Sequence, residues 1–106
     1  MKVLLDECVD LRLRPAIAGH EVRTAHEMGW SARRNVELLL RAAREFDAFV
    51  TVDRFVSFQQ TLLAFELAVI VLRARSDTLV DLMALVPGLL EVLPIAARGV
   101  ATIVEL

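Results

Sequence analysis

Three acidic side chains stand where apolar segments of the chain end or begin. Asp6 follows the apolar run 3–5, Asp53 follows the run 48–52, and Glu37 lies between them in sequence. An uninterrupted apolar run is typical of a strand buried on both faces of a parallel sheet. Ligands bind at the carboxyl ends of such strands, and carboxylates that converge there repel one another unless a cation lies between them. The three residues therefore predict a site for Mg²⁺ or Mn²⁺ in which all three are metal ligands and catalytic groups.

A divalent cation held in this way polarises a phosphoryl oxygen and activates a water molecule. The chemistry that these residues predict is therefore hydrolysis of a phosphodiester. Several arginines follow the predicted third and fourth strands on the same rim as the acids, where they would contact phosphates. The complete set of candidates for substrate contact is Glu7, Asn35, Arg54, Gln59, Arg73 and Arg75.

Alternating strands and helices must position these side chains. We expect strands at residues 2–5, 20–24, 48–53, 67–73 and 99–106, with helices at 9–18, at 36–45 behind an Asn35 N-cap, and from about 78 to 93 with a break at 87–88. Pro15 predicts either a kink in the first helix or a first turn followed by a helix that starts at Pro15, and residues 54–64 are expected to form a loop with a short helix. This alternation predicts one α/β domain over residues 1–106, with three layers and a mostly parallel sheet.

Short right-handed connections favour the strand order 2-1-3-4, with the last strand at an edge of the sheet. In that order the first and third strands are neighbours. Asp6 and Asp53 would then face one another across the crevice between the two strands.

Composition restricts the class of protein. Apolar residues make up 57% of the 106, and the mean hydropathy of +0.57 predicts that a second copy or a partner chain covers an apolar face. The net charge of −2 does not indicate a generally basic surface, although eleven of the twelve basic residues are arginine. The single cysteine, Cys8, excludes an internal disulfide and a cysteine-rich zinc site.

The most apolar segment, residues 79–93, is interrupted by Asp81, Pro87-Gly88 and Glu91. It cannot provide the roughly 20 apolar residues that a membrane span requires. The N-terminus leads directly into a strand without the pattern of a signal peptide, so we expect a cytoplasmic protein.

Motifs along nearly the whole chain resemble one known family. They are Met1-Lys-Val-Leu-Leu-Asp-Glu, Gly29-Trp30, Val50-Thr-Val-Asp-Arg54, Phe58-Gln-Gln60 and Val69-Ile-Val-Leu-Arg-Ala-Arg-Ser76. Together they resemble the DUF5615 PIN-like family, which is related to Mut7-C and toxin nuclease domains. The resemblance implies a parallel sheet covered by helices on both faces, and an Mg²⁺- or Mn²⁺-dependent endoribonuclease. It also implies a homodimer and a toxin that is neutralised by a small antitoxin protein.

By this resemblance, Asp6 corresponds to the acid of the first strand and Asp53 to the acid of the Thr-x-Asp motif. The chain also departs from the family pattern. The middle helix often starts with Asp-Glu-Glu, where this chain has Asn35-Val-Glu37. Cys8 stands where the family often has Asn, and Phe55 where it often has Asp or Asn. These departures leave fewer oxygen ligands for a metal.

Two other functions are open at this point. One is a catalytically degenerate PIN-like module that binds RNA or a partner protein without cutting. The other is a phosphorylation receiver domain, which is also a small α/β unit with acids at the ends of its first and third strands. A receiver needs a lysine after a later strand, and Lys2 is the one lysine of the chain.

Overall fold

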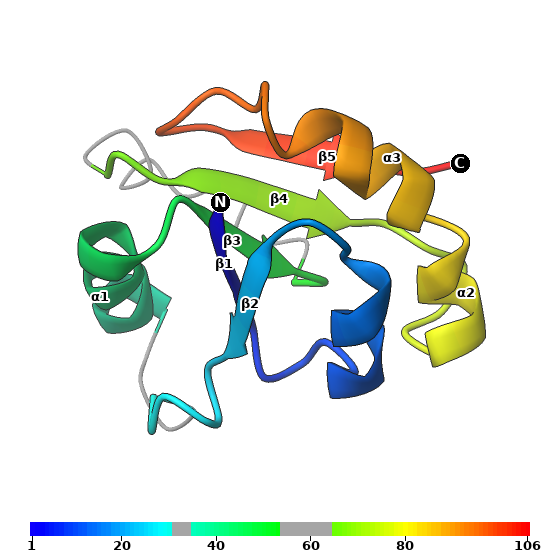
Figure 1. The fold of residues 1–106 in the computed structure, drawn as a ribbon, viewed down its shortest axis with the longest axis horizontal. Helices are drawn as coiled ribbons and strands as arrows, with labels where there is room; N and C mark the ends of the chain where they lie inside the picture. The colour runs from blue at the N-terminus through cyan, green and yellow to red at the C-terminus, as the bar shows by residue number, and fades with distance from the viewer. Residues whose placement is uncertain (31–34, 54–64) are drawn as a thin grey trace.

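A parallel β-sheet runs through the middle of the molecule (Figure 1). The computed structural model describes residues 1–30, 35–53 and 65–106. Within these residues the sheet has five strands in the order β2-β1-β3-β4-β5, and every neighbouring pair is parallel. The strands are β1 (Lys2–Leu5), β2 (Glu21–Thr24), β3 (Ala48–Thr51), β4 (Ala68–Leu72) and β5 (Ala101–Val104).

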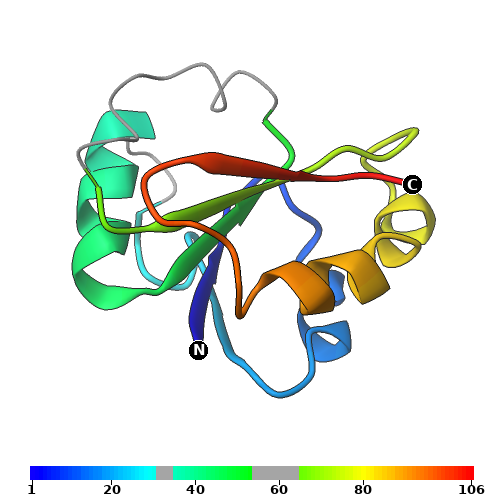
Figure 2. The same ribbon diagram turned by 90° about the horizontal axis from the view of Figure 1, so that it is seen from above.

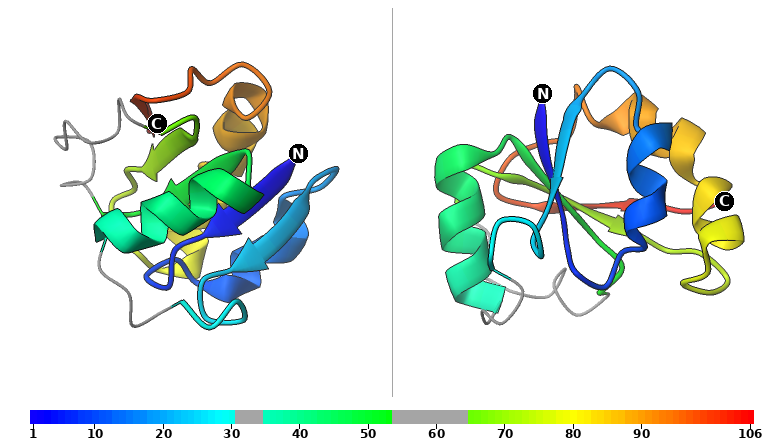
Figure 3. Two further views of the ribbon diagram at one scale, coloured as in Figure 1. Left: turned by 90° about the vertical axis from the view of Figure 1, so that its left-hand side faces the viewer. Right: turned by 60° about the horizontal axis from the view of Figure 1, so that its bottom comes forward.

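Helices cover both faces of the sheet, which gives the three layers expected of an α/β domain (Figures 2 and 3). One face is packed against α1 (Asn35–Glu45). The opposite face is packed against the 3₁₀ helix η1 (Leu11–Ala16) and the helices α2 (Leu79–Met83) and α3 (Val86–Val92).

Strand β1 illustrates why apolar runs form the centre of this sheet. Successive side chains of a strand point to opposite faces. Val3 and Leu5 pack in one core cluster with Leu13 of η1, whereas Leu4 packs in the other cluster with Leu39 of α1. All of these side chains are fully buried, so the strand needs apolar residues at consecutive positions.

The first helix differs from the expectation of a kinked helix over residues 9–18. The chain forms only η1, whose N-terminal Asp10 accepts a hydrogen bond from the backbone N–H of Arg12. Pro15 lies inside this helix and has no N–H with which to continue an α-helical ladder. A short 3₁₀ helix needs fewer such bonds, which explains the shorter element.

The expected break at Pro87-Gly88 was placed incorrectly. Helix α2 ends at Met83 and a new helix, α3, begins at Val86 with Pro87 in its first turn. A proline there loses no intrahelical hydrogen bond, so it starts a helix and does not interrupt one. Gly88 faces β5, where a Cβ atom would lie 3.1 Å from Cγ1 of Val104, and α3 therefore packs closely on that strand.

β1 has the expected bounds, and the other four strands are shorter than expected. β2 begins at Glu21, β4 extends from Ala68 to Leu72 and β5 covers only Ala101–Val104. β3 ends at Thr51, so Asp53 lies two residues beyond it. Residues 31–34 and 54–64, including the predicted loop with a short helix, lie outside the described residues.

Among the described residues, no helix has both the length and the apolar character that crossing a membrane would require. This agrees with the interruptions seen in the apolar segment 79–93.

Candidate functional site

The carboxyl ends of β1 and β3 bring Asp6 next to Thr51. Leu5 pairs with Val50 in the sheet, and the backbone N–H of Asp6 donates to the carbonyl oxygen of Val50 at 2.9 Å. The hydroxyl of Thr51 then donates to Oδ2 of Asp6 at 2.7 Å. Thr51 is fully buried while Asp6 is half-buried, so a buried hydroxyl holds a carboxylate at the edge of the sheet.

Asp53 joins the same group through its backbone. Its N–H donates to Oγ1 of Thr51 at 3.0 Å, so one hydroxyl links the Asp6 carboxylate to the main chain of Asp53. Asp53 is half-buried. Thr51 is a residue of the site that sequence reasoning missed, although its place in the Thr-x-Asp motif was a usable signal, because a hydroxyl there can bond an acid on the neighbouring strand.

Cys8 is a second residue whose contacts the sequence did not predict. Its Sγ donates to Oδ2 of Asp6 at 3.3 Å and lies 3.5 Å from Oγ1 of Thr51. Cys8 is exposed as a residue, but partial burial of its thiol raises the pKa above the ordinary value of 9.0, and the charge of Asp6 adds to this. The thiol therefore stays protonated near neutral pH and acts as a hydrogen-bond donor beside the carboxylate.

The Asp6 carboxylate is well supplied with donors. Oδ2 accepts from Thr51 and Cys8, and Oδ1 accepts from the backbone N–H of Glu7 at 2.8 Å. A carboxylate has about four acceptor positions, so one position on Oδ1 remains for a further ligand. The side chain of Glu7 itself is exposed.

Glu37 lies in the first turn of α1 and is exposed. Helix α1 follows β2 in the chain and precedes β3. Its first turn is therefore at the carboxyl edge of the sheet, the edge at which Asp6 lies. A carboxylate at a helix N-terminus is stabilised by the helix dipole. Within residues 1–30, 35–53 and 65–106, however, no three His, Cys, Asp or Glu side chains are grouped to hold a metal ion.

Arg73 and Arg75 follow the carboxyl end of β4, as predicted. They line a pocket of about 300 Å³ together with Ala74, Asp81, Ala84, Glu105 and Leu106. Both arginines are exposed, and Nε of Arg73 lies 3.7 Å from Oε2 of Glu105. Two guanidinium groups in a pocket can bind an anion such as a phosphate. Asp81 and Glu105 balance their two positive charges, so the four side chains carry no net charge.

The remaining predicted substrate residues are not described. Arg54 and Gln59 lie outside the described residues, as does the side chain of Asn35. The backbone of Asn35 forms the first residue of α1, and its role as an N-cap stays a prediction.

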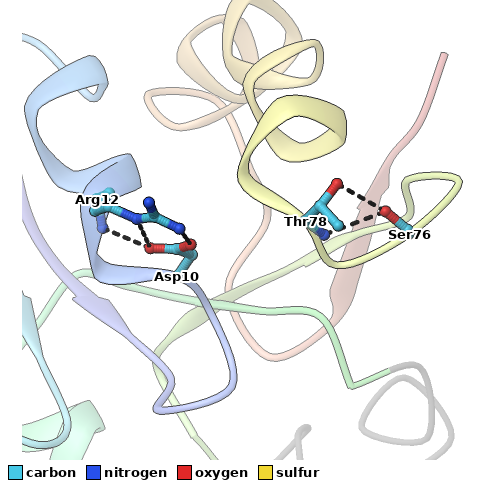
Figure 4. Close-up of polar contacts among 4 residues, drawn as sticks. All are labelled: Asp10, Arg12, Ser76 and Thr78. Carbon is cyan, nitrogen blue, oxygen red and sulfur yellow. Dashed lines mark hydrogen bonds and ion pairs between the residues drawn. The ribbon is translucent and has the colours of Figure 1, made fainter.

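Two local polar clusters lie beside the carboxyl edge, at the start of η1 and before α2 (Figure 4). Arg12 forms a bidentate ion pair with Asp10. Its Nε donates to Oδ1 at 3.1 Å and its Nη2 donates to Oδ2 at 2.7 Å. The hydrogen bonds from Arg12 lower the pKa of Asp10 to about 2.

In the second cluster, Ser76 donates its hydroxyl proton to Oδ2 of Asp81 at 2.6 Å. The backbone N–H of Thr78 donates to Oγ of Ser76 at 3.2 Å, and the two hydroxyl oxygens lie 2.8 Å apart. Since Ser76 has one hydroxyl proton, the hydroxyl of Thr78 donates to Ser76 in this arrangement. The cluster fixes the chain between the pocket arginines and α2.

Lys2 lies at the start of β1, at the amino end of the parallel sheet. Its Nζ is 5.5 Å from the centre of the Phe46 ring, and its backbone N–H donates to Asp47. Lys2 is thus at the opposite end of the sheet from Asp53. This position argues against a receiver domain, which needs a lysine near the phosphorylated acid.

In comparisons with protein-family models, with curated proteins and with solved structures, none matches this chain. The resemblance to the DUF5615 PIN-like family stays a prediction from the sequence motifs.

Proposed function

We propose that the chain is an Mg²⁺- or Mn²⁺-dependent endoribonuclease of the PIN-like class. The observation that carries the proposal is the Thr51 hydroxyl, which bonds the Asp6 carboxylate and the Asp53 backbone at once. Acids from two neighbouring strands thus belong to one hydrogen-bonded group at the carboxyl edge, which is where ligands bind in parallel sheets.

The geometry is compatible with the way proteins bind Mg²⁺. This ion is usually held by one or two carboxylates, with waters and substrate phosphates completing its coordination. Oδ1 of Asp6 has an acceptor position for such an ion, Asp53 supplies the second carboxylate, and Glu37 is the third candidate ligand. A bound metal would activate water and polarise the phosphate that is attacked.

The substrate is proposed to be RNA because the pocket arginines follow β4 on the same edge. Arg73 and Arg75 would contact backbone phosphates beside the cleaved bond. The proposal of a toxin neutralised by a small antitoxin protein is supported by the sequence resemblance.

Calorimetry with Mn²⁺ tests the metal site directly. We expect the wild-type chain to bind Mn²⁺ and the variants Asp6→Asn and Asp53→Asn to bind it at least about tenfold more weakly, since each loses a ligand. Glu91→Gln, an exposed acid on α3, is the matched control and should bind like the wild type. A folded wild-type chain that binds no Mn²⁺ at millimolar concentration contradicts the proposal.

RNA cleavage provides the second readout. Cleavage by the wild-type chain should need added metal, stop with EDTA and be lost in Asp6→Asn, while circular dichroism shows that the variant is folded.

One observation favours the alternative of a degenerate RNA-binding or partner-binding module. The Cys8 thiol, where the family often has Asn, donates to Asp6 and uses one of its acceptor positions. For such a module, RNA or partner binding should be the same in the wild type and in Asp6→Asn, with no cleavage by either.

A further inference from the structure

The two outer strands of the sheet differ in how their edges are protected. The exposed residues of β2 are Glu21 and Arg23, and Arg23 lies 3.5 Å from Glu21 and 3.9 Å from Glu27. Charged side chains of this kind prevent an edge strand from pairing with another chain. β5 consists of Ala101, Thr102, Ile103 and Val104, and so has no charged residue and no proline.

The outer side of β5 carries backbone groups that can pair. The backbone N–H of Arg73 donates to the carbonyl oxygen of Val104 at 2.9 Å, so that carbonyl faces β4. In a parallel ladder the N–H and C=O of one residue point to the same side, and the side alternates along the strand. Thr102 therefore also faces β4, whereas the backbone groups of Ala101 and Ile103 point to the outer edge.

Apolar side chains are exposed on β5 and on the stretch of chain that leads into it. Ile103 is 43% exposed on β5, Val100 is 41% exposed just before it, and Ile95 is 79% exposed in the preceding turn. These residues come from one stretch of the chain that leads into the outermost strand (Figure 1). Within residues 1–30, 35–53 and 65–106, no strand pairs with the outer side of β5. An edge of this kind with exposed apolar side chains is suited to pairing with another strand.

We propose that β5 pairs antiparallel with β5 of a second copy, so that two sheets join into one across a two-fold axis. The register follows from the outward residues. Ala101 of each copy would form the hydrogen-bonded pair with Ile103 of the other, and the two Thr102 residues would face one another on the axis. This register pairs Ala101, Thr102 and Ile103 of each strand with the same three residues of the other copy, places Val104 opposite Val100, and satisfies the outward ladder positions.

Charge complementarity supports a second copy as the occupant. Arg98 precedes β5 and Glu105 follows it, so an antiparallel pair places opposite charges at each end of the interface, whereas a parallel pair places like charges together. Within its own chain Arg98 lies 3.4 Å from Asp47, and its Nη1 donates to the carbonyl oxygen of Glu66. Glu105 lies 3.7 Å from Arg73. Both side chains are about half exposed, so each can still meet a charge from the second copy.

The antiparallel arrangement has a consequence for the candidate site. The carboxyl edges of the two sheets point in opposite directions, so each copy would keep its own Asp6 edge. The pairing is therefore independent of the proposed nuclease activity.

Analytical ultracentrifugation tests whether the chain forms a dimer through β5. We expect the wild-type chain to form a dimer, and Ile103→Lys to raise the dissociation constant at least about tenfold, because it places a charge on the edge. The matched control is Val80→Lys on α2, which changes a residue that is 80% exposed away from β5 and should leave the dimer intact. A monomeric wild type, or a dimer unchanged by Ile103→Lys, overturns the proposal.

A covalent trap tests the register without relying on stability. In a Cys8→Ser background, Thr102→Cys should form a disulfide-linked dimer on mild oxidation, because the facing Cα atoms of such a pair are about 4.5 Å apart. Val80→Cys in the same background is the control and should stay mainly monomeric. Equal cross-linking of the two variants contradicts the pairing of Thr102 with itself.

Discussion

Asp6 and Asp10 lie four residues apart in the segment after β1, yet they obtain their hydrogen bonds in different ways. Asp10 is bonded by Arg12, two positions away and exposed to solvent. Asp6 accepts from Thr51, which is 45 positions away in sequence and fully buried. The comparison teaches that a local ion pair can be formed by the segment alone, whereas the Asp6 group exists only once β1 and β3 have paired.

The largest effect is expected at the buried partner of Asp6. Thr51→Val keeps the shape of the side chain but removes the hydroxyl that bonds Asp6 and the N–H of Asp53. We expect a loss of about 1–3 kcal/mol in the free energy of unfolding, because buried polar groups lose their partner. Urea unfolding measures this value.

Thr51→Ser is the matched control, because it keeps the hydroxyl and loses one buried methyl group worth about 0.8 kcal/mol. If Thr51→Val costs no more than Thr51→Ser, the hydroxyl does not stabilise the Asp6 group.

An intermediate effect is expected for the reactivity of Cys8. Burial and the nearby Asp6 charge raise the pKa of the thiol, and only the thiolate is nucleophilic. Iodoacetamide should therefore alkylate Cys8 of the native chain severalfold more slowly at pH 8 than it alkylates a cysteine peptide. Asp6→Asn should increase the rate only in part, since burial is the larger cause. A native rate equal to that of the peptide argues against this arrangement.

The smallest effect is expected at Asp10. Its pKa is lowered from 3.8 to about 2, so the folded state binds its proton less readily than the unfolded state does. The stabilisation from Asp10 is fully present above pH 3.8 and is lost as the pH falls toward 2. The melting temperature of Asp10→Asn should thus be slightly below that of the wild type at pH 6, with the difference shrinking around pH 2 and disappearing below it.

Solvent exposure limits the size of this last effect. Added salt should reduce the difference at pH 6. A difference that is as large well below pH 2 as at pH 6 would rule out the ion pair as its cause.

Much of the fold could be predicted because the relevant signals are local. The run Val3-Leu4-Leu5 predicts a doubly buried strand, and the two core clusters confirm it. The errors at Pro15 and Pro87 arose because a proline ends one helix or begins another according to where the helix starts. That starting point depends on packing against the sheet as well as on the residues of the helix.

The candidate site was predictable only in outline. The acids after β1 and β3 were correctly expected at the carboxyl edge, but the contacts of Thr51 and Cys8 with Asp6 were not. The contact between Thr51 and Asp6 joins positions that are far apart in sequence. The contact between Cys8 and Asp6 depends on how the chain turns after β1. The hydrophobic periodicity of the sequence predicts neither contact.

The sequence by itself determined which segments are apolar enough to be buried on both faces, and hence a layered domain with a parallel sheet. Only the tertiary structure decided that the Thr51 hydroxyl meets Asp6, and that β5, unlike β2, lies at an edge without charged side chains. The physical reason is that burial preferences are properties of single residues and short segments. Hydrogen bonds between strands and the exposure of an edge depend on which strands become neighbours.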